Sequence, residues 1–121
     1  MLVGLTAMLE GRWFAATTLL DPRRFWETLE DTLPDMLVLD VDLPGMSGID
    51  LCRVVRNEPR WSELPVLFLT VKTDTRTLVQ VFAAGGDDYV SKPIVEPELI
   101  ARMTGGLERA QIAVSAGDTD P

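Results

Sequence analysis

The sequence contains no histidine among its 121 residues, and it contains a single cysteine, Cys52. Without histidine there can be no imidazole base, no His-based catalytic triad and no histidine metal ligand. One cysteine cannot form an internal disulfide, which fits a reducing compartment such as the cytoplasm. Any chemistry must therefore come from Asp, Glu, Lys, Thr or Ser side chains.

Long apolar runs and an excess of positive charge are also missing. No apolar stretch approaches the ~18 residues that cross a bilayer, and the N-terminus lacks the charged start and cleavage pattern of a signal peptide. Eleven Lys and Arg residues stand against 19 Asp and Glu residues, which gives a net charge of −8. We therefore expect a cytoplasmic protein that has no membrane contact and binds no nucleic acid directly.

The chain has enough apolar material for one core, because 46% of its residues are hydrophobic. We expect one domain over residues 1–110, followed by a tail or linker over 111–121. Apolar stretches typical of strands alternate with segments of helical periodicity. The expected strands cover 13–19, 36–40, 65–70 and 87–91, and the expected helices start near Pro22, Ser47, Asp74 and Pro97. This alternation predicts an α/β fold, a doubly wound open parallel sheet with helices on both faces.

Several helix signals can be checked residue by residue. Expected N-caps are Asp21, Ser47 (in a capping box with Asp50) and either Thr73 or Asp74. Residues expected on the inward faces or at core spacing are Phe25, Leu29, Leu33, Leu51, Val54, Val55, Leu78, Phe82, Leu99, Ile100, Met103 and Leu107.

Three successive strands end in side chains that suit phosphoryl chemistry, namely Asp40, Thr70 and Lys92. In open parallel sheets, ligands bind outside the carboxyl ends of the strands. A carboxylate can attack a phosphoryl group if cations neutralise the crowded oxygens, so Asp40 is the expected nucleophile, with a lysine charge and a threonine hydroxyl beside it. Taken singly, the three residues also fit a turn cap, a strand end and a solvated lysine.

A family resemblance rests on three stretches: "PDMLVLDVDLPGMSGIDLCRVVR", "LPVLFLT" and "FAAGGDDYVSKPIVEPELIARM". Together they resemble the receiver domain of bacterial two-component response regulators, from Leu9 to Met103. The resemblance implies a flavodoxin-like receiver fold. It also implies that Asp40 is the phosphoacceptor, Thr70 the switch hydroxyl, Tyr89 the rotating aromatic residue and Lys92 the phosphate-binding lysine.

The resemblance implies further features of the site and its partners. A cis peptide bond would precede Pro93, and Mg²⁺ would bind the Asp40 carboxylate and the backbone carbonyl of Asp42. A histidine kinase would donate the phosphoryl group, and an output domain, a partner protein or a second copy would dock on the face formed by residues 74–110. Such a domain assists its own phosphorylation and is not an enzyme in its own right.

The N-terminus departs from the family pattern. The start "MLVGLTAMLEGRWF" resembles part of the first receiver helix, so the usual first strand and its Mg²⁺-binding acidic pair are absent. We expect an empty central position in the sheet, unless the tail "QIAVSAGDTD" fills it from the same chain or from a partner in a segment-swapped homodimer. The tail residues "DTDP" alternatively resemble the entry to a diguanylate cyclase domain.

Two other functions remain open at this point. A pseudo-receiver would use the same fold for protein binding without phosphorylation. A haloacid-dehalogenase-like phosphatase would use Asp40 and Asp42 with Thr70, and with Asp87 and Asp88 as its later acidic pair.

Overall fold

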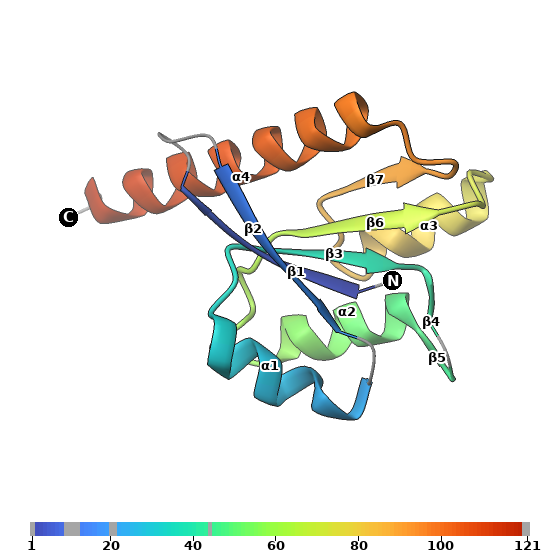
Figure 1. Ribbon diagram of the computed structural model, residues 1–121, viewed down its shortest axis with the longest axis horizontal. Helices are drawn as coiled ribbons and strands as arrows, with labels where there is room; N and C mark the ends of the chain where they lie inside the picture. Colours follow the sequence, from blue (N-terminus) through green and yellow to red (C-terminus); the bar gives the residue numbers. More distant parts are fainter. Residues whose placement is uncertain (1, 9–12, 20–21, 44, 120–121) are drawn as a thin grey trace.

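The computed structural model describes residues 2–8, 13–19, 22–43 and 45–119, with side chains over 23–43 and 45–110. A sheet of five strands runs through the molecule in the order β2-β1-β3-β6-β7 (Figure 1). Its strands are β1 (Leu2–Met8), β2 (Trp13–Leu19), β3 (Met36–Asp40), β6 (Val66–Thr70) and β7 (Asp88–Ser91). Two short strands, β4 (Asp42–Leu43) and β5 (Met46–Ser47), pair with each other beside it.

The central position of the sheet is occupied, contrary to our expectation. Residues Leu2–Met8, expected to continue a helix, form β1, which pairs antiparallel with both β2 and β3. Leu2 lies opposite Leu39 of β3 and Leu19 of β2. An empty position would have left two rows of backbone donors and acceptors unpaired, and the N-terminal segment satisfies them. The predicted parallel sheet is therefore mixed, since β1 runs against the other four strands.

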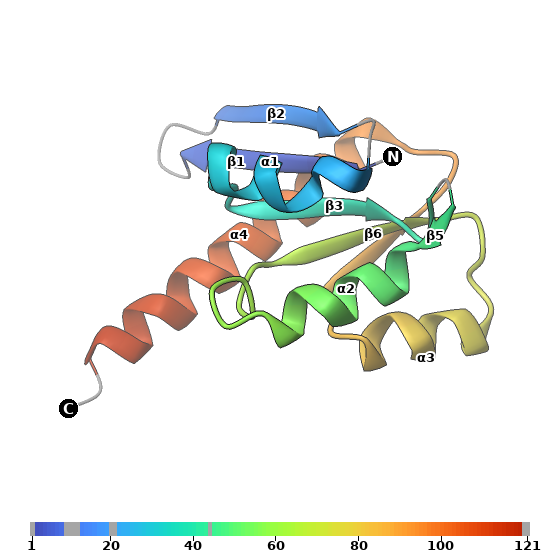
Figure 2. The same cartoon turned by 90° about the horizontal axis from the view of Figure 1, so that it is seen from below.

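Helices cover both faces of the sheet, as predicted for a doubly wound fold. They are α1 (Phe25–Thr32), preceded by a 3-10 turn (Pro22–Arg24), α2 (Gly48–Asn57), α3 (Thr75–Ala83) and α4 (Glu96–Thr119). Figures 1 and 2 show α1, α2 and α3 on one face and α4 on the other. None of the described helices is long and apolar enough to span a membrane. Residues 111–119, for which we expected a tail or linker and, as the alternative, a strand in the sheet, instead continue α4 as far as Thr119.

Two of the predicted N-caps are confirmed. The Ser47 hydroxyl accepts hydrogen bonds from the backbone N–H groups of Ile49 (3.2 Å) and Asp50 (3.5 Å) at the start of α2. Asp74, rather than Thr73, caps α3 and accepts from the Thr77 N–H at 3.1 Å. Such caps satisfy backbone donors that have no partner inside the helix. Asp21 lies outside the described residues.

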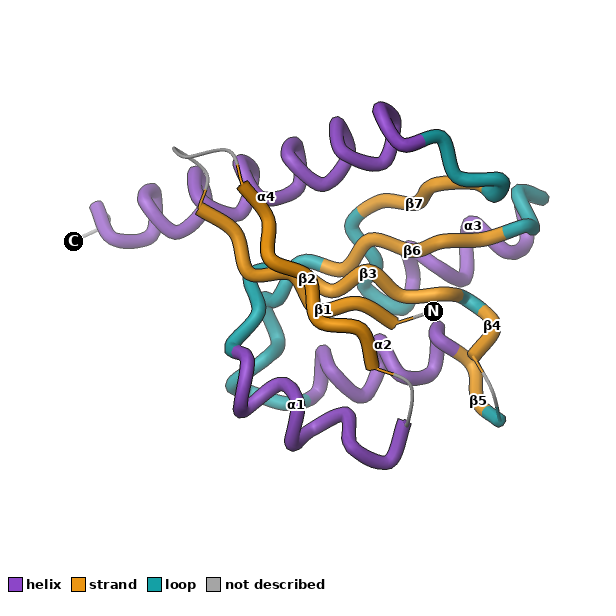
Figure 3. The backbone as a smooth tube through the Cα atoms, viewed as in Figure 1, coloured by secondary structure: helices purple, strands orange, loops and turns teal. Residues whose placement is uncertain are grey.

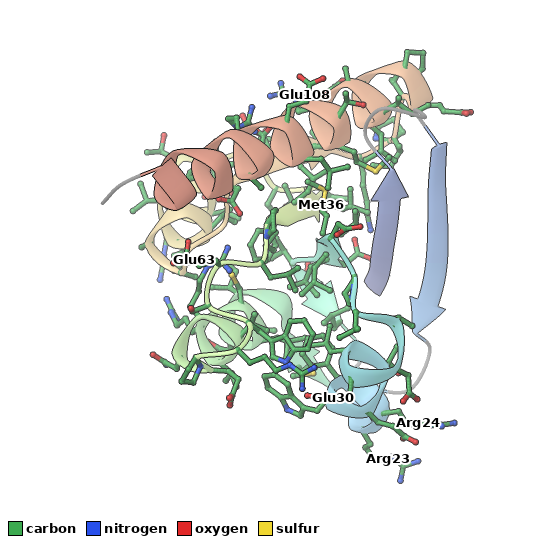
Figure 4. The ribbon with its side chains drawn as sticks, turned by 90° about the vertical axis from the view of Figure 1, so that its left-hand side faces the viewer. Arg23, Arg24, Glu30, Met36, Glu63 and Glu108 are labelled. Atoms are coloured by element: carbon green, nitrogen blue, oxygen red, sulfur yellow. The ribbon has the colours of Figure 1, made fainter. Side chains whose placement is uncertain are left out.

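The core consists of two apolar clusters, one on each face of the sheet, because β3 and β6 are buried on both sides. The cluster beneath α1, α2 and α3 includes Phe25, Leu29, Leu37, Leu39, Leu51, Cys52, Val55, Phe68 and Val81. The cluster beneath α4 consists of Met36, Val38, Leu67, Leu69, Val90, Met103 and Leu107. Figure 4 shows Met36 between the sheet and α4.

The predicted inward faces are correct at most positions and wrong at four. Leu33, Val54, Phe82 and Ile100 are 56%, 51%, 48% and 40% exposed. Leu33 follows α1 as its C-cap in the left-handed region (φ 45°), so it has left the helical face. Cys52 is buried in α2, and Val81 is buried in α3. In α2, Leu51 and Val55 are buried as predicted, and only Val54 is on the wrong face. In α3 the buried stripe, which contains Thr77 and Val81, lies one position before the predicted one.

Cys52 is a buried core residue, as its apolar surroundings predict. It has no exposed surface, and its Sγ contacts the carbonyl oxygen of Ala84 at 3.4 Å. Burial raises the pKa of the Cys52 thiol above its ordinary value, since the thiolate would lose its hydration.

Arg56 connects α2 to the edge of the sheet where the parallel strands begin. Its guanidinium donates to Gly85 O at 2.8 and 3.1 Å, Leu64 O at 2.6 Å, Ser62 O at 3.2 Å and Asp87 Oδ2 at 3.1 Å. The same Asp87 oxygen accepts from the Val66 N–H at 2.8 Å, at the start of β6. One side chain thus meets the hydrogen-bonding demand of several partly buried carbonyl groups by donating to all of them.

Replacing Arg56 by alanine should lower the free energy of unfolding by about 2–3 kcal/mol, because partly buried carbonyl groups lose their donors. Arg53→Ala is the matched control, since Arg53 forms an exposed ion pair with Asp50 one turn earlier in α2. We expect a change of at most about 0.5 kcal/mol for that variant. Urea unfolding followed by circular dichroism measures both values. Equal effects of the two substitutions would contradict the structural role of Arg56.

Candidate functional site

The parallel strands β3, β6 and β7 end at one edge of the sheet (Figure 3), and each of three predicted residues lies at or directly after one of these strand ends. Asp40 ends β3, Thr70 ends β6, and Lys92 directly follows β7. Backbone hydrogen bonds fix this arrangement: the Val41 N–H donates to Leu69 O at 3.0 Å, and the Lys92 N–H donates to Thr70 O at 2.8 Å. The sheet register therefore brings an acid, a hydroxyl and an amine to one edge.

Asp40 and Lys92 form a direct ion pair. Lys92 Nζ lies 2.6 Å from Asp40 Oδ1, while the Asp40 side chain is only 6% exposed and that of Lys92 is 37% exposed. A carboxylate that has lost most of its hydration needs a nearby positive charge to stay ionised at low cost. The lysine meets this need and remains accessible from solvent.

The Thr70 hydroxyl lies at the same edge, but its hydrogen-bond partners are backbone groups of the following turn, whereas we expected it beside the Asp40 carboxylate. Thr70 is 3% exposed, and its Oγ1 donates to the carbonyl oxygen of Lys72 at 3.0 Å and accepts from the Lys72 N–H at 2.9 Å. Threonine hydroxyls commonly bond the backbone of the following turn in this way. Sequence reasoning placed Thr70 correctly and missed the Lys72 backbone, because no residue pattern marks such a local bond.

Tyr89 lies one strand position away from the buried Val90, half-buried against α3. Its ring packs edge-on against Phe82, with centroids 6.2 Å apart and planes at 78°. The cis peptide bond between Lys92 and Pro93 is present, as the family resemblance implies.

Gly48 brings the first turn of α2 against the backbone of Asp40. Its N–H donates to Val41 O at 2.7 Å, and a Cβ at this position would overlap the carbonyl oxygen of Asp40. The short pairing of Asp42 with Ser47 closes the intervening loop. Only glycine permits this close approach, so Gly48 positions the backbone that carries the site. The stretch that carries the family resemblance contains two glycines here, Gly45 and Gly48, and does not indicate which of them is needed.

The described residues do not fit the Mg²⁺ site that the resemblance implies. Within the described part of the chain, no group of three or more acidic, cysteine or histidine side chains is placed to hold a metal. Asp40 is paired with Lys92, and Asp42, whose backbone carbonyl is the other expected ligand, lies in β4 opposite Ser47 of β5. Because β1 runs antiparallel, it begins at this edge with Leu2, whereas a parallel strand would end there.

Asp87 and Asp88 do not join the site. Asp87 is bound to Arg56 and to the backbone at the beginning of β6, at the opposite edge of the sheet. Asp88 receives hydrogen bonds from Arg102 at 3.2 Å, on the face formed by β7 and α4. The phosphatase alternative therefore lacks the later acidic pair that it requires.

Comparisons with known proteins agree with this geometry. The family model described as "Response regulator receiver domain" matches residues 1–104. Protein RcaC of Microchaete diplosiphon is 47% identical over 107 residues, which cover 88% of this chain and 16% of RcaC. The phosphate regulon transcriptional regulatory protein PhoB of Rhizobium meliloti is 43% identical over 103 residues, covering 85% of this chain and 45% of PhoB. The chain thus spans less than half the length of these curated relatives.

Solved structures show the same fold. The response regulator DrrB of Thermotoga maritima, described as an OmpR/PhoB homolog, has a TM-score of 0.68 and 35% identity, covering 77% of this chain and 41% of DrrB. NtrX of Brucella abortus has a TM-score of 0.77 over 86% of this chain and 23% of NtrX. Its identity of 24% supports the likeness of fold alone.

Gly48→Ala should destabilise the protein by about 2–4 kcal/mol, because the added methyl group must displace the Asp40 backbone. Gly105→Ala is the matched control, since its Cβ would meet only the end of the Arg109 side chain, at 3.2 Å, in the interior of α4. That variant should gain about 0.5–1 kcal/mol. Urea unfolding gives both values, and a Gly48→Ala protein as stable as the parent would refute the close approach.

Proposed function

The chain belongs to the response regulator receiver domain family, and from this premise we propose that it accepts a phosphoryl group on Asp40. The observation that supports this most directly is the contact between Lys92 Nζ and Asp40 Oδ1, at 2.6 Å, at the edge where the parallel strands end. This contact combines a poorly solvated carboxylate, which can act as a nucleophile, with a cation that can neutralise charge on the phosphoryl oxygens.

In the proposed reaction, a carboxylate oxygen of Asp40 attacks phosphorus and forms an acyl phosphate. The bond between phosphorus and the donor breaks, and the donor leaves with the electron pair. Because the chain contains no histidine, the donor is the phosphohistidine of a partner kinase or a small acyl phosphate. Lys92 is placed to neutralise charge on the phosphoryl oxygens. Receiver domains generally bind Mg²⁺ for phosphorylation, but the residues described above supply no such site.

The switch that we propose begins at Thr70. Phosphorylation adds nearly two negative charges beside Asp40, and these compete with the Lys72 backbone for the Thr70 hydroxyl. Movement of Thr70 would free space behind it and let Tyr89 leave its edge contact with Phe82. This change would reach the exposed apolar residues of the 74–110 face, which are Val79, Phe82, Ile94, Val95 and Ile100.

We propose that this face binds an output domain, a partner protein or a second copy of the chain. Relatives include proteins named as transcriptional or DNA-binding regulators, such as PhoB and MtrA. With a net charge of −8, this domain itself is poorly suited to a phosphate backbone, so we assign any DNA contact to another part of a longer cytoplasmic signalling protein. In this proposal the domain is a signalling module, and catalysis beyond its own phosphorylation belongs elsewhere.

A pseudo-receiver is the second candidate function, and one observation favours it. The central strand β1 runs antiparallel and brings no acidic side chain from its described residues to the Asp40 edge. In that case the same fold and the same apolar face would bind a partner without phosphorylation. Labelling of Asp40 distinguishes the two functions.

Incubation with acetyl phosphate should add one phosphoryl group to the protein, and Asp40→Asn should abolish the addition, because an amide is a poor nucleophile. Asp31→Asn, an exposed residue of α1, is the matched control and should be labelled like the parent. Intact-protein mass spectrometry under neutral conditions measures the product. Labelling that persists in Asp40→Asn would show that another residue is the acceptor, and a folded parent that is never labelled would favour the pseudo-receiver.

Thr70→Ala should still be labelled at Asp40, yet it should lose the coupling to Tyr89. We expect nuclear magnetic resonance signals of the Tyr89 ring to shift on phosphorylation in the parent and to remain in place in the variant. Thr70→Ser, which keeps the hydroxyl, should behave like the parent. Equal Tyr89 shifts in all three proteins would contradict the proposed switch.

A further inference from the structure

The acidic side chains at or near the Asp40 edge, in the described part of the chain, are already bound to other protein groups or are exposed to solvent. Asp40 Oδ1 is in contact with Lys92 Nζ. Asp74, the first acid after β6, uses both oxygens on Thr77, accepting from its N–H at 3.1 Å and from its hydroxyl at 2.8 Å. Asp42 is exposed in β4. Asp40 is therefore the single buried carboxylate that this part of the chain brings to the edge.

The direction of β1 explains why no second carboxylate joins it from the middle of the sheet. A parallel strand in this position would finish beside Asp40 and could present polar residues there. The antiparallel β1 starts beside β3 instead, with Leu2 opposite Leu39, and on its other side the neighbouring strand β2 ends with Leu19. On the side of Asp40 formed by β1 and β2, the described strand ends at this edge are thus apolar, whereas β6 on the other side ends with Thr70.

Electrostatics then disfavours a divalent cation at this carboxylate. Mg²⁺ requires about six oxygen ligands in a nearly octahedral arrangement and gives up its water reluctantly. A dication bound to Asp40 would lie next to the Lys92 ammonium, which is already 2.6 Å from the same carboxylate. With one buried carboxylate and no group of acidic side chains around it, the described residues supply too few oxygen ligands to offset the repulsion between the two cations.

From this arrangement we propose that Asp40 and the other described residues form no divalent-cation site, and that Lys92 supplies the positive charge for phosphoryl acceptance without Mg²⁺. The proposal rests on the function proposed above. With acetyl phosphate as donor, an Asp40 oxygen bonds to phosphorus, the bond from phosphorus to the acetyl oxygen breaks, and acetate leaves with the electron pair. The step needs no redox partner and no net proton transfer.

Metal binding can be tested without any phosphorylation, by adding Mn²⁺ to the ¹⁵N-labelled protein. Paramagnetic Mn²⁺ at Asp40 would broaden the amide signals of Val41 and Lys92 selectively. We expect these two signals to broaden no more than that of Asp50, an exposed carboxylate residue that can bind cations only weakly. Selective broadening at Val41 and Lys92 that excess Mg²⁺ reverses would overturn the proposal.

The rate of Asp40 labelling by acetyl phosphate supplies the second test. We expect the rate with Mg²⁺ and the rate with a chelator to agree within about twofold. Lys92→Ala should lower the rate at least about tenfold in both conditions, and Lys92→Arg should restore part of it. Arg53→Ala is the matched control and should leave the rate unchanged, because Arg53 is an exposed cation of α2 that pairs with Asp50 away from the site.

The outcomes separate the two proposals. A rate that Mg²⁺ raises about tenfold or more, or a Lys92→Ala protein that Mg²⁺ restores, would overturn metal independence while supporting Asp40 as the acceptor. A folded protein that is labelled in neither condition would overturn the proposed phosphorylation, and the Mn²⁺ experiment would still decide whether Asp40 binds a divalent cation.

Discussion

The pairing of the Asp40 carboxylate with the Lys92 ammonium is the interaction on which the site depends. The two residues are far apart in the sequence, and they meet because β3 and β7 flank β6 in a fixed parallel register. The apolar packing that stabilises β6 therefore also keeps the carboxylate and the ammonium group together at one edge of the sheet. The core and the functional site are consequences of the same strand pairing.

The sequence predicted those parts of the fold whose signals are local. Continuous apolar runs identified β3 and β6, and Ser47 marked the start of α2 through its side-chain cap. The edge location of Asp40, Thr70 and Lys92 followed from the ends of these strands. What could not be predicted depends on distant partners: Leu2–Met8 is a strand because β2 and β3 lie on either side of it. Its own periodicity does not specify that pairing.

The wrong assignments of buried faces have a similar cause. Val54 and Phe82 have the spacing of core residues but are exposed, and in α3 Val81 occupies the buried position instead of Phe82. A helix rotates slightly to fit the sheet that it covers, and the sequence of the helix alone does not contain that rotation. In α3 the result is that the Phe82 ring is exposed to solvent next to Tyr89, on the face that we propose for partner binding.

Because β1 runs antiparallel, the sheet contains two kinds of strand connection. β1 and β2 follow each other as a hairpin, which needs no crossover helix, whereas β3, β6 and β7 are joined through α2 and α3. Hairpins close within about 1–10 μs, but pairings between distant segments must first overcome the entropy of long loops. Assembly of the three strands that carry the acid, the hydroxyl and the amine is therefore expected to limit the rate at which the whole sheet forms.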